Sequence, residues 1–270
     1  MRGHLLKMAA QLEEPVKYTL NLDDHTIDMN DQIGKAFSIH HTGIIHCINC
    51  GRKTKKSFFQ GYCYPCYISL PQTDPSVIHP EKNQAHLGIS RDMEWAKKHD
   101  LIDHFVYLAL SGGLKVGVTR HTQIPTRWID QGAHSAVKLA RTPHRNLAGQ
   151  VEVALKKHMN DKTNWRAMLT DKKEGEPDLL EAREKAINQL PGDLKHYAES
   201  DDTITKIQYP VEAYPQKVKS VNLDKDPNFN GVLIGIRGQY LIFEEGLVMN
   251  VRKYNGYEVE LNIDQNNISS

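Results

Sequence analysis

The sequence predicts an α+β fold, and three observations lead to this prediction. All four cysteines of the 270-residue chain lie between positions 47 and 66. Runs that alternate apolar and polar residues, typical of strands, lie near both ends of the chain. The middle alternates strand-like and helix-like runs in the order ββαβα. We therefore expect a cysteine module, a ββαβα core, and a β-rich barrel or sandwich module built from the N- and C-terminal strands.

Changes in composition and periodicity divide the chain into six segments. They are an N-terminal β segment (1–43), the cysteine module (44–70), a linker with a short helix (71–103), the ββαβα core (104–170), a charged helical linker (171–203) and a C-terminal β module (204–270).

The first part of the chain reads mainly as strands. Residues 16–22 alternate, and residues 36–40 lead to an expected turn at Thr42-Gly43. After a proline-rich loop, residues 90–98 are predicted to form a short helix with Ser90 as its N-cap.

The core segment begins with a hairpin. Residues 104–110 and 115–119 form its two strands, and Gly112-Gly113 lies in the turn, where glycine provides positive φ. With a two-residue turn, Tyr107 shares a sheet face with Val116 and Val118, and Lys115 points to the opposite face. A helix starting near Pro125, a strand over 136–140 and a helix over 147–158 complete the predicted core.

The last hundred residues begin with a charged stretch and then become β-rich. A helix over 179–190 ends before Pro191-Gly192, which makes this charged stretch a plausible divider. Strands follow in short succession, separated by glycine and asparagine, at 218–223, 232–236, 240–243, 247–252 and 257–263.

Charge is distributed unevenly along the chain. The formal net charge is +1, but residues 1–170 contain 22 Lys and Arg against 15 Asp and Glu, and residues 171–270 contain 12 against 18. A basic front half favours an anionic partner, although a merely solvated surface gives the same counts. We see no membrane-length apolar run and no signal-peptide pattern, so we expect a cytoplasmic protein with no membrane partner.

The cysteines form two CxxC pairs, and the intervening twelve residues match known zinc spacings. Two disulfides or four buried thiols are the alternatives, but no other cysteine in the chain indicates a disulfide framework. Four thiolates close the coordination sphere of zinc, so the metal would be structural. The predicted zinc ribbon has as its ligands Cys47, Cys50, Cys63 and Cys66.

A basic turn connects the two cysteine pairs. Cations that can contact phosphate stand beside aromatic rings that can stack on bases, a combination found in proteins that bind single strands or RNA. The alternative is a solvated turn above a small aromatic core. The candidate nucleic-acid contacts are Arg52, Lys53, Lys55, Lys56 and Phe58, with Arg120 from the core segment.

The order of elements in the core segment brings together a set of residues that matches what phosphodiester hydrolysis needs. Tyr107 lies in the first strand, Gly117 in the second, Arg127 early in the next helix and Glu152 in a later helix. An arginine neutralises phosphate charge, a carboxylate holds a divalent cation and a tyrosine positions or deprotonates water.

Residues 104–168 resemble the core of GIY-YIG nucleases. The resemblance rests on Tyr107, on Lys115-Val116-Gly117, on Arg127 and on Glu152, with Asn164 matching a later family asparagine. It implies an endonuclease in which Tyr107, Arg127, Glu152 and Asn164 are catalytic and Glu152 binds Mg²⁺ or Mn²⁺. Lys115 is either a substitute catalytic cation or a solvated strand residue. The chain has Phe105 at the first motif's glycine and Lys115 at the second motif's tyrosine.

Each candidate also has a structural interpretation. Tyr107 alternates with other strand residues and fits a core position, Arg127 fits a surface beside Trp128, and Glu152 stands four residues before Lys156, a favourable helical ion pair. His79, Glu81 and His86 could form a second metal cluster, but we favour an ordinary polar loop.

Almost the whole chain also resembles an uncharacterised bacterial zinc-ribbon family of unknown function. The matching stretches lie at residues 51–58, 115–120, 127–133 and 238–243. This kinship implies no activity.

Three functional hypotheses follow. The first is a nucleic-acid-binding protein, acting on RNA or DNA, with divalent-metal-dependent endonuclease activity. The second is a non-catalytic RNA- or ribosome-associated factor, which the replacement of the second tyrosine favours. The third is a protein–protein adaptor that uses the acidic C-terminal β module.

Overall fold

The computed structural model describes residues 1–159, 161–173 and 175–264, which form two compact units. Unit 1 combines Met1–Tyr67 with the described chain from Gln208 onward, and unit 2 is Ile68–Ile207. None of the helices in the described ranges has both the length and the apolar character of a membrane span.

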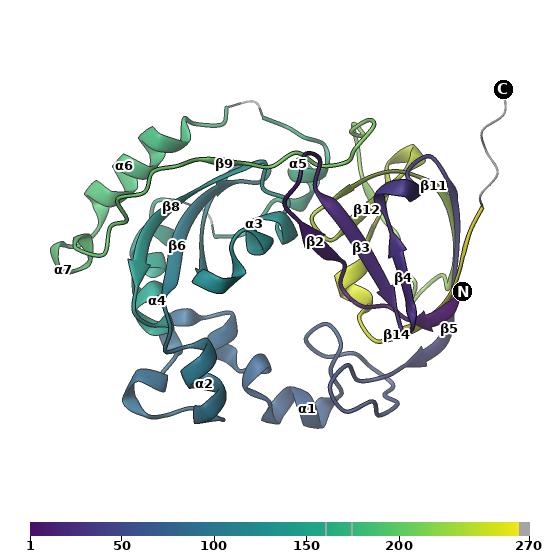
Figure 1. The fold of residues 1–270 in the computed structure, drawn as a ribbon, viewed down its shortest axis with the longest axis horizontal. Coiled ribbons are helices and arrows are strands. Elements are labelled where there is room, and N and C mark those ends of the chain that lie inside the picture. The colour runs from purple at the N-terminus through teal and green to yellow at the C-terminus, as the bar shows by residue number, and fades with distance from the viewer. Residues whose placement is uncertain (160, 174, 265–270) are drawn as a thin grey trace. The chain divides into compact units, whose positions relative to one another are not determined.

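Unit 1 is built on β-sheets that join the two ends of the chain (Figure 1). A seven-stranded sheet has the order β1-β14-β5-β11-β12-β13-β10, and a three-stranded sheet has the order β2-β3-β4. The predicted sharing of one module by N- and C-terminal strands is therefore confirmed. The strands are β1 (Arg2–His4), β2 (Ala9–Gln11), β3 (Lys17–Leu22), β4 (His25–Asp28), β5 (Ala36–Ile45), β10 (Lys219–Ser220), β11 (Asn228–Arg237), β12 (Tyr240–Phe243), β13 (Leu247–Asn250) and β14 (Tyr257–Ile263).

The core of unit 1 contains a cluster of phenylalanines between β5, β11 and β12. The ring of Phe243 lies edge-on to those of Phe37 and Phe229, with centroids 6.0 and 4.6 Å away. The turn expected at Thr42-Gly43 is wrong, because both residues lie within β5. Gly43, at φ +80°, lies in a β-bulge of β5 opposite β14. The pairing of β5 with β14 continues on both sides of this bulge.

Unit 2 contains a four-stranded sheet with the order β7-β6-β8-β9, so β7 is an edge strand. Its strands are β6 (His104–Leu110), β7 (Leu114–Arg120), β8 (Ser135–Thr142) and β9 (Thr205–Lys206). The helices of this region are α1 (Tyr64–Ser69), which spans the unit boundary, α2 (Met93–His99), α3 (Thr126–Asp130), α4 (Arg145–Lys156), α5 (Trp165–Leu169), α6 (Leu179–Gln189) and α7 (Gly192–Lys195).

The two faces of this sheet are covered by different helices (Figure 1). Val106, Leu108 and Val116 form a buried core with apolar residues of α4 and α6. On the other face, Tyr107 contacts Trp128 of α3, with ring centroids 6.0 Å apart. The observed order of β6, β7, α3, β8 and α4 is the predicted ββαβα order.

Two predictions about the flanking segments are corrected. The charged stretch 171–203 is not a divider, because Leu179 and Ala186 of α6 are buried in the unit 2 core. Segment 71–103 also belongs to unit 2, and its short helix α2 is capped by Asp92, which accepts a hydrogen bond from Trp95 N, not by Ser90. A carboxylate two residues later provides the acceptor that Ser90 was expected to supply.

The hairpin register differs from the predicted one. Leu110 pairs with Leu114, so the loop has three residues, Ser111-Gly112-Gly113. Tyr107 therefore lies directly opposite Gly117, and Ala109 opposite Lys115. One extra loop residue places the side chains of Tyr107 and Lys115 on the same face of the sheet.

Candidate functional site

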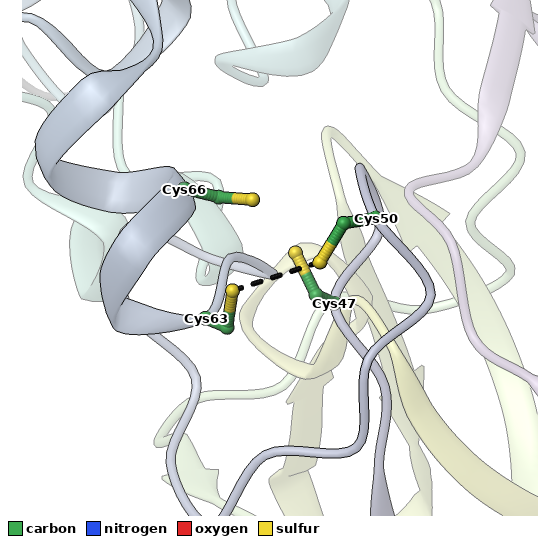
Figure 2. A group of neighbouring side chains, drawn as sticks. All are labelled: Cys47, Cys50, Cys63 and Cys66. Atoms are coloured by element: carbon green, nitrogen blue, oxygen red, sulfur yellow. Dashed lines mark hydrogen bonds between the residues drawn. The ribbon is translucent and has the colours of Figure 1, made fainter.

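The four cysteine side chains of unit 1 converge on one point (Figure 2). Their sulfur atoms all lie within 4.8 Å of one another, and the Sγ atoms of Cys50 and Cys63 are 3.7 Å apart. Tetrahedral zinc with bonds of about 2.3 Å separates its sulfur ligands by roughly 3.8 Å. The geometry and the donor set therefore fit a zinc ion, with Cys47, Cys50, Cys63 and Cys66 as ligands.

Local backbone structure directs these thiols inward. In the first CxxC turn, Gly51 N donates to Cys47 O at 2.9 Å, and in the second, Tyr67 N donates to Cys63 O at 2.9 Å as α1 begins. Burial opposes ionisation of Cys47, but backbone N–H groups, led by that of Cys50, outweigh it and lower the pKa of this thiol to about 6. A thiolate is thus favoured at a position where a metal would bind it.

The cysteine module is fastened to the seven-stranded sheet. His46 N donates to Gly256 O at 2.8 Å, and Asn255 Nδ2 donates to Gln60 O at 3.1 Å. Gly256 has φ +81°, and a Cβ at this residue would lie 2.1 Å from His46 O. The backbones approach so closely that only glycine fits, which fixes the module to the start of β14.

The basic turn between the cysteine pairs is exposed. Arg52, Lys53, Lys55 and Lys56 are all exposed, and none forms an ion pair within the described ranges. Phe58 is only half-buried, but it packs against Tyr67 at a centroid distance of 5.7 Å with nearly parallel rings. The cations are therefore accessible, whereas the ring of Phe58 already takes part in an aromatic cluster.

In unit 2, the tyrosine of β6 crosses the edge strand. Tyr107 is fully buried, and its hydroxyl donates to Gln131 Oε1 at 2.6 Å. A Cβ at Gly117 would lie 2.6 Å from that hydroxyl oxygen. The glycine leaves the space that lets the ring pass over β7 toward the edge of the sheet.

Two charged side chains act on this phenol. The guanidinium of Arg127 in α3 and the carboxylate of Glu152 in α4 both interact with it electrostatically. Burial raises the pKa of Tyr107, and the Arg127 guanidinium partly offsets this effect. The structure therefore brings together the phenol, guanidinium and carboxylate predicted from the sequence.

Lys115 completes this cluster. The residue is 3% exposed, and its ammonium group donates to Thr163 Oγ1 at 3.1 Å. Burial, followed by the positive charge of Arg127, lowers the pKa of Lys115 to about 7, while Glu152 acts in the opposite direction. Near neutral pH, this amine can therefore exchange a proton.

Glu152 lies on a polar stripe of α4 that also includes Arg145, Gly149 and Lys156. Its carboxylate is 3.3 Å from Lys156 Nζ, which also contacts Asp161 at 3.1 Å. Burial raises the pKa of Glu152, and Lys156 opposes that shift. The predicted ion pair with Lys156 is confirmed, but Glu152 is buried and not on a solvated surface.

The surroundings of Glu152 are acidic. Glu81 and Asp161 interact with it electrostatically, and Glu81 Oε2 is buried without a hydrogen-bond partner in the described chain. Mg²⁺ and Mn²⁺ accept this kind of oxygen donor, and Mg²⁺ commonly takes one or two carboxylates together with water and substrate phosphate. These carboxylates are donors of a suitable type, but within the described ranges Glu81, Glu152 and Asp161 do not converge into a metal-type cluster.

The remaining candidates lie in different places. Asn164 is exposed and is the N-cap of α5, where its Oδ1 accepts from Ala167 N at 3.2 Å. Asn164 is therefore not part of the cluster around Tyr107. Arg120 is at the end of β7, on the sheet face opposite to Tyr107. Within the described residues, the four cysteines are the one group of His, Cys, Asp or Glu side chains close enough together to hold a metal ion. His79, Glu81 and His86 therefore form no such group.

Sequence reasoning missed several partners of the cluster. Gln131 and Thr163 hold the reactive groups of Tyr107 and Lys115, and Glu81 and Asp161 set the charge around Glu152. Their roles depend on loops far apart in the sequence, and no local pattern in the chain marks them.

Residues 34–259 match a family described as a protein of unknown function (DUF2797). The chain belongs to the DUF2797 family. The matched range includes both cysteine pairs and all of unit 2. It therefore covers the cysteine module and the cluster of Tyr107, Lys115, Arg127 and Glu152, here called the β7 cluster. Neither the search of curated proteins nor the search of solved structures returned a match.

Proposed function

We propose that this DUF2797 protein binds nucleic acid and that unit 2 is a GIY-YIG-like, metal-dependent phosphodiesterase. The observation that carries the proposal is the gathering of Tyr107, Lys115, Arg127 and Glu152 at one sheet edge, with Gly117 making way for the phenol. The three-residue loop supports it further, because it places Tyr107 and Lys115 on one face.

Each group has a role in this reaction. Arg127 would bind the scissile phosphate, since a guanidinium donates paired hydrogen bonds to phosphate oxygens. Water adds to phosphorus as the bond to the leaving oxygen breaks, and the leaving oxygen takes a proton from solvent. Lys115, as a neutral amine, would accept the proton of the attacking water, and the Tyr107 hydroxyl would position that water. A cation held by Glu152 would supply charge stabilisation for the phosphate.

The cysteine module would supply a nucleic-acid contact of its own. A zinc ion with four thiolate ligands has no open position, so it would hold the module in shape and take no part in chemistry. The exposed cations Arg52, Lys53, Lys55 and Lys56 would contact the phosphate backbone, with Phe58 beside them.

A non-catalytic nucleic-acid-binding factor is the second candidate, and burial favours it. Tyr107 is inaccessible, Lys115 is 3% exposed and Glu152 is 7% exposed. A hydrolase needs its substrate phosphate to reach these groups, so cleavage would require α3 or a neighbouring loop to move. A binding factor requires no such opening.

One experiment separates these candidates. Cleavage of mixed single-stranded RNA and DNA is measured with Mg²⁺ or Mn²⁺ for the full chain and for Glu152→Gln, with Glu184→Gln as an exposed control. We expect Glu152→Gln to lose about 100-fold or more in cleavage rate, because it removes the metal-binding charge, and to retain binding. Glu184→Gln should match the wild type.

Two other outcomes would contradict the proposed phosphodiesterase activity. Salt-dependent binding without cleavage by the wild type would assign the protein to the non-catalytic class. Absence of salt-dependent binding to either nucleic acid would reject the whole proposal and leave the protein-adaptor hypothesis.

A further inference from the structure

A polar cavity lies in unit 2, where β7 ends and α4 begins. Its volume is about 320 Å³, the lower end of the range for small-molecule sites. Segment 71–103, which lies before the ββαβα core, provides much of its wall. The residues that matter here are Gln72, Trp95, His99, Asp100, Arg120 and Arg145.

Positive charge exceeds negative charge in this cavity. Arg120 forms no ion pair or hydrogen bond through its guanidinium within the described ranges, and it interacts at longer range with Asp100. Arg145 donates to two neutral backbone oxygens, Ser76 O at 3.0 Å and Val77 O at 2.7 Å. Two guanidinium groups thus share the single carboxylate of Asp100, an arrangement that favours an anion.

An aromatic surface stands beside these cations. The rings of Trp95 and His99 are parallel within 7°, with centroids 4.1 Å apart, and His99 Nδ1 bonds to Trp95 O at 2.8 Å. Both side chains are only partly buried. Gln72 adds an amide whose Oε1 has no hydrogen-bond partner in the described chain. A nucleobase is bound by stacking on an aromatic ring and by hydrogen bonds to polar groups such as an amide.

The cavity is electrostatically coupled to the β7 cluster. Arg145 interacts with Arg127 and with Glu152, which lies seven residues, or two turns, further along α4. An anionic chain bound at Arg127 would therefore extend toward Arg120 and Arg145.

We propose that this cavity binds one nucleoside monophosphate unit, with its base on Trp95 and His99 and its phosphate at Arg120. The proposal rests on the proposed function and deepens it, because it places a flanking nucleotide of a single-stranded substrate beside the candidate catalytic cluster. A free nucleotide has the same chemistry and would use the same contacts.

Calorimetric titration of the full chain tests this proposal. The probes are AMP, adenosine, inorganic phosphate and a single-stranded oligoadenylate of eight residues. We expect saturable binding of AMP and of the oligonucleotide, and weaker binding of adenosine and phosphate, because each of these keeps only half of the contacts.

Three variants locate the binding. Arg120→Gln should weaken AMP binding about 10-fold or more, since it removes a charge-assisted hydrogen bond. Trp95→Leu should weaken it at least about fivefold through lost stacking. Lys98→Gln, which removes an exposed charge from the same helix α2, should bind like the wild type. Arg120→Gln keeps the test decisive if Trp95→Leu does not fold.

Two results would overturn the proposal: phosphate binding as tight as AMP binding, or unchanged affinity of AMP and oligonucleotide in a folded Arg120→Gln variant. If that unchanged affinity accompanies Glu152-dependent cleavage, the cavity is wrong and the proposed function stands. AMP binding that depends on Arg120, without oligonucleotide binding or cleavage, supports the cavity, assigns it to a free nucleotide and rejects the proposed function.

Discussion

At the scale of single residues, Gly117 decides the shape of the candidate site. Its missing side chain lets the Tyr107 ring cross the edge strand, and the register that puts the two residues opposite each other comes from one additional loop residue. A motif of a tyrosine and a glycine is visible in the sequence. That the glycine makes space for that tyrosine is visible only in the structure.

Gly117→Ala should destabilise unit 2 by about 1–3 kcal/mol, because the new Cβ would lie 2.6 Å from the Tyr107 hydroxyl oxygen and 2.7 Å from Cζ. Denaturant unfolding measures the free-energy change. In a Tyr107→Leu background the same substitution should cost clearly less, as a double-mutant cycle would show. Equal costs in both backgrounds would mean that the two residues are not coupled.

Lys115→Met should stabilise the protein at acidic and neutral pH. The folded-state pKa of Lys115, about 7, lies below its ordinary value of 10.5, so between these values the unfolded state binds more protons and wild-type stability rises with pH. Below about pH 7 the cost of the buried charge is fully present, and removing it should add about 2–4 kcal/mol.

Unfolding curves at pH 6 and pH 10 check this prediction. The advantage of Lys115→Met should shrink at pH 10, whereas the exposed Lys98→Met should show no such trend. A gain that is the same at both pH values would contradict a depressed pKa for Lys115.

At the scale of elements, helix α4 connects segment 71–103 to the sheet. Asn146 Nδ2 donates to the backbone oxygens of Glu81 and Asn83 at 2.8 and 2.9 Å, and Gly149 lies against the backbone of Glu81. These contacts bring Glu81 toward Glu152. The proline-rich segment is thus an integral part of unit 2.

Gly149→Ala should destabilise unit 2 by about 2 kcal/mol or more, although alanine is the better helix former. A Cβ at Gly149 would lie 2.1 Å from Glu81 N and 2.4 Å from Pro80 C, and neither backbone atom can move easily. Gly192→Ala in α7 is the matched control, since nothing lies within 4 Å of its Cβ position. Thermal unfolding should show a lower unfolding temperature for Gly149→Ala and an unchanged or higher unfolding temperature for Gly192→Ala.

At the scale of the whole molecule, the chain forms two units that contain different clusters of functional side chains. Unit 1 has a four-cysteine module whose geometry fits a metal ion, fastened to a sheet that joins the two ends of the chain, and unit 2 has its own buried core. Since each unit has its own stabilising contacts, we expect each to respond differently to loss of metal.

Removal of zinc by a chelator should lower the unfolding temperature of unit 1 and leave that of unit 2 nearly unchanged. Metal analysis should give one zinc per chain, and Cys63→Ser should mimic chelation and respond no further to the chelator. Calorimetry resolves the two transitions. A purified protein without zinc and with an unaltered melting profile after chelation would disprove the assignment.

The sequence by itself determined the features that depend on neighbours along the chain. The spacing of Cys47, Cys50, Cys63 and Cys66 implied a metal site because each CxxC turn is local. Strands β12 and β14 have the predicted bounds because glycine and asparagine separate these short runs along the chain. Only the tertiary structure decided the loop length at Ser111, the burial of α6, and the approach of Glu81 to Glu152. The physical reason is that register, packing and burial are set by contacts between distant segments, whose energies have no counterpart in local residue patterns.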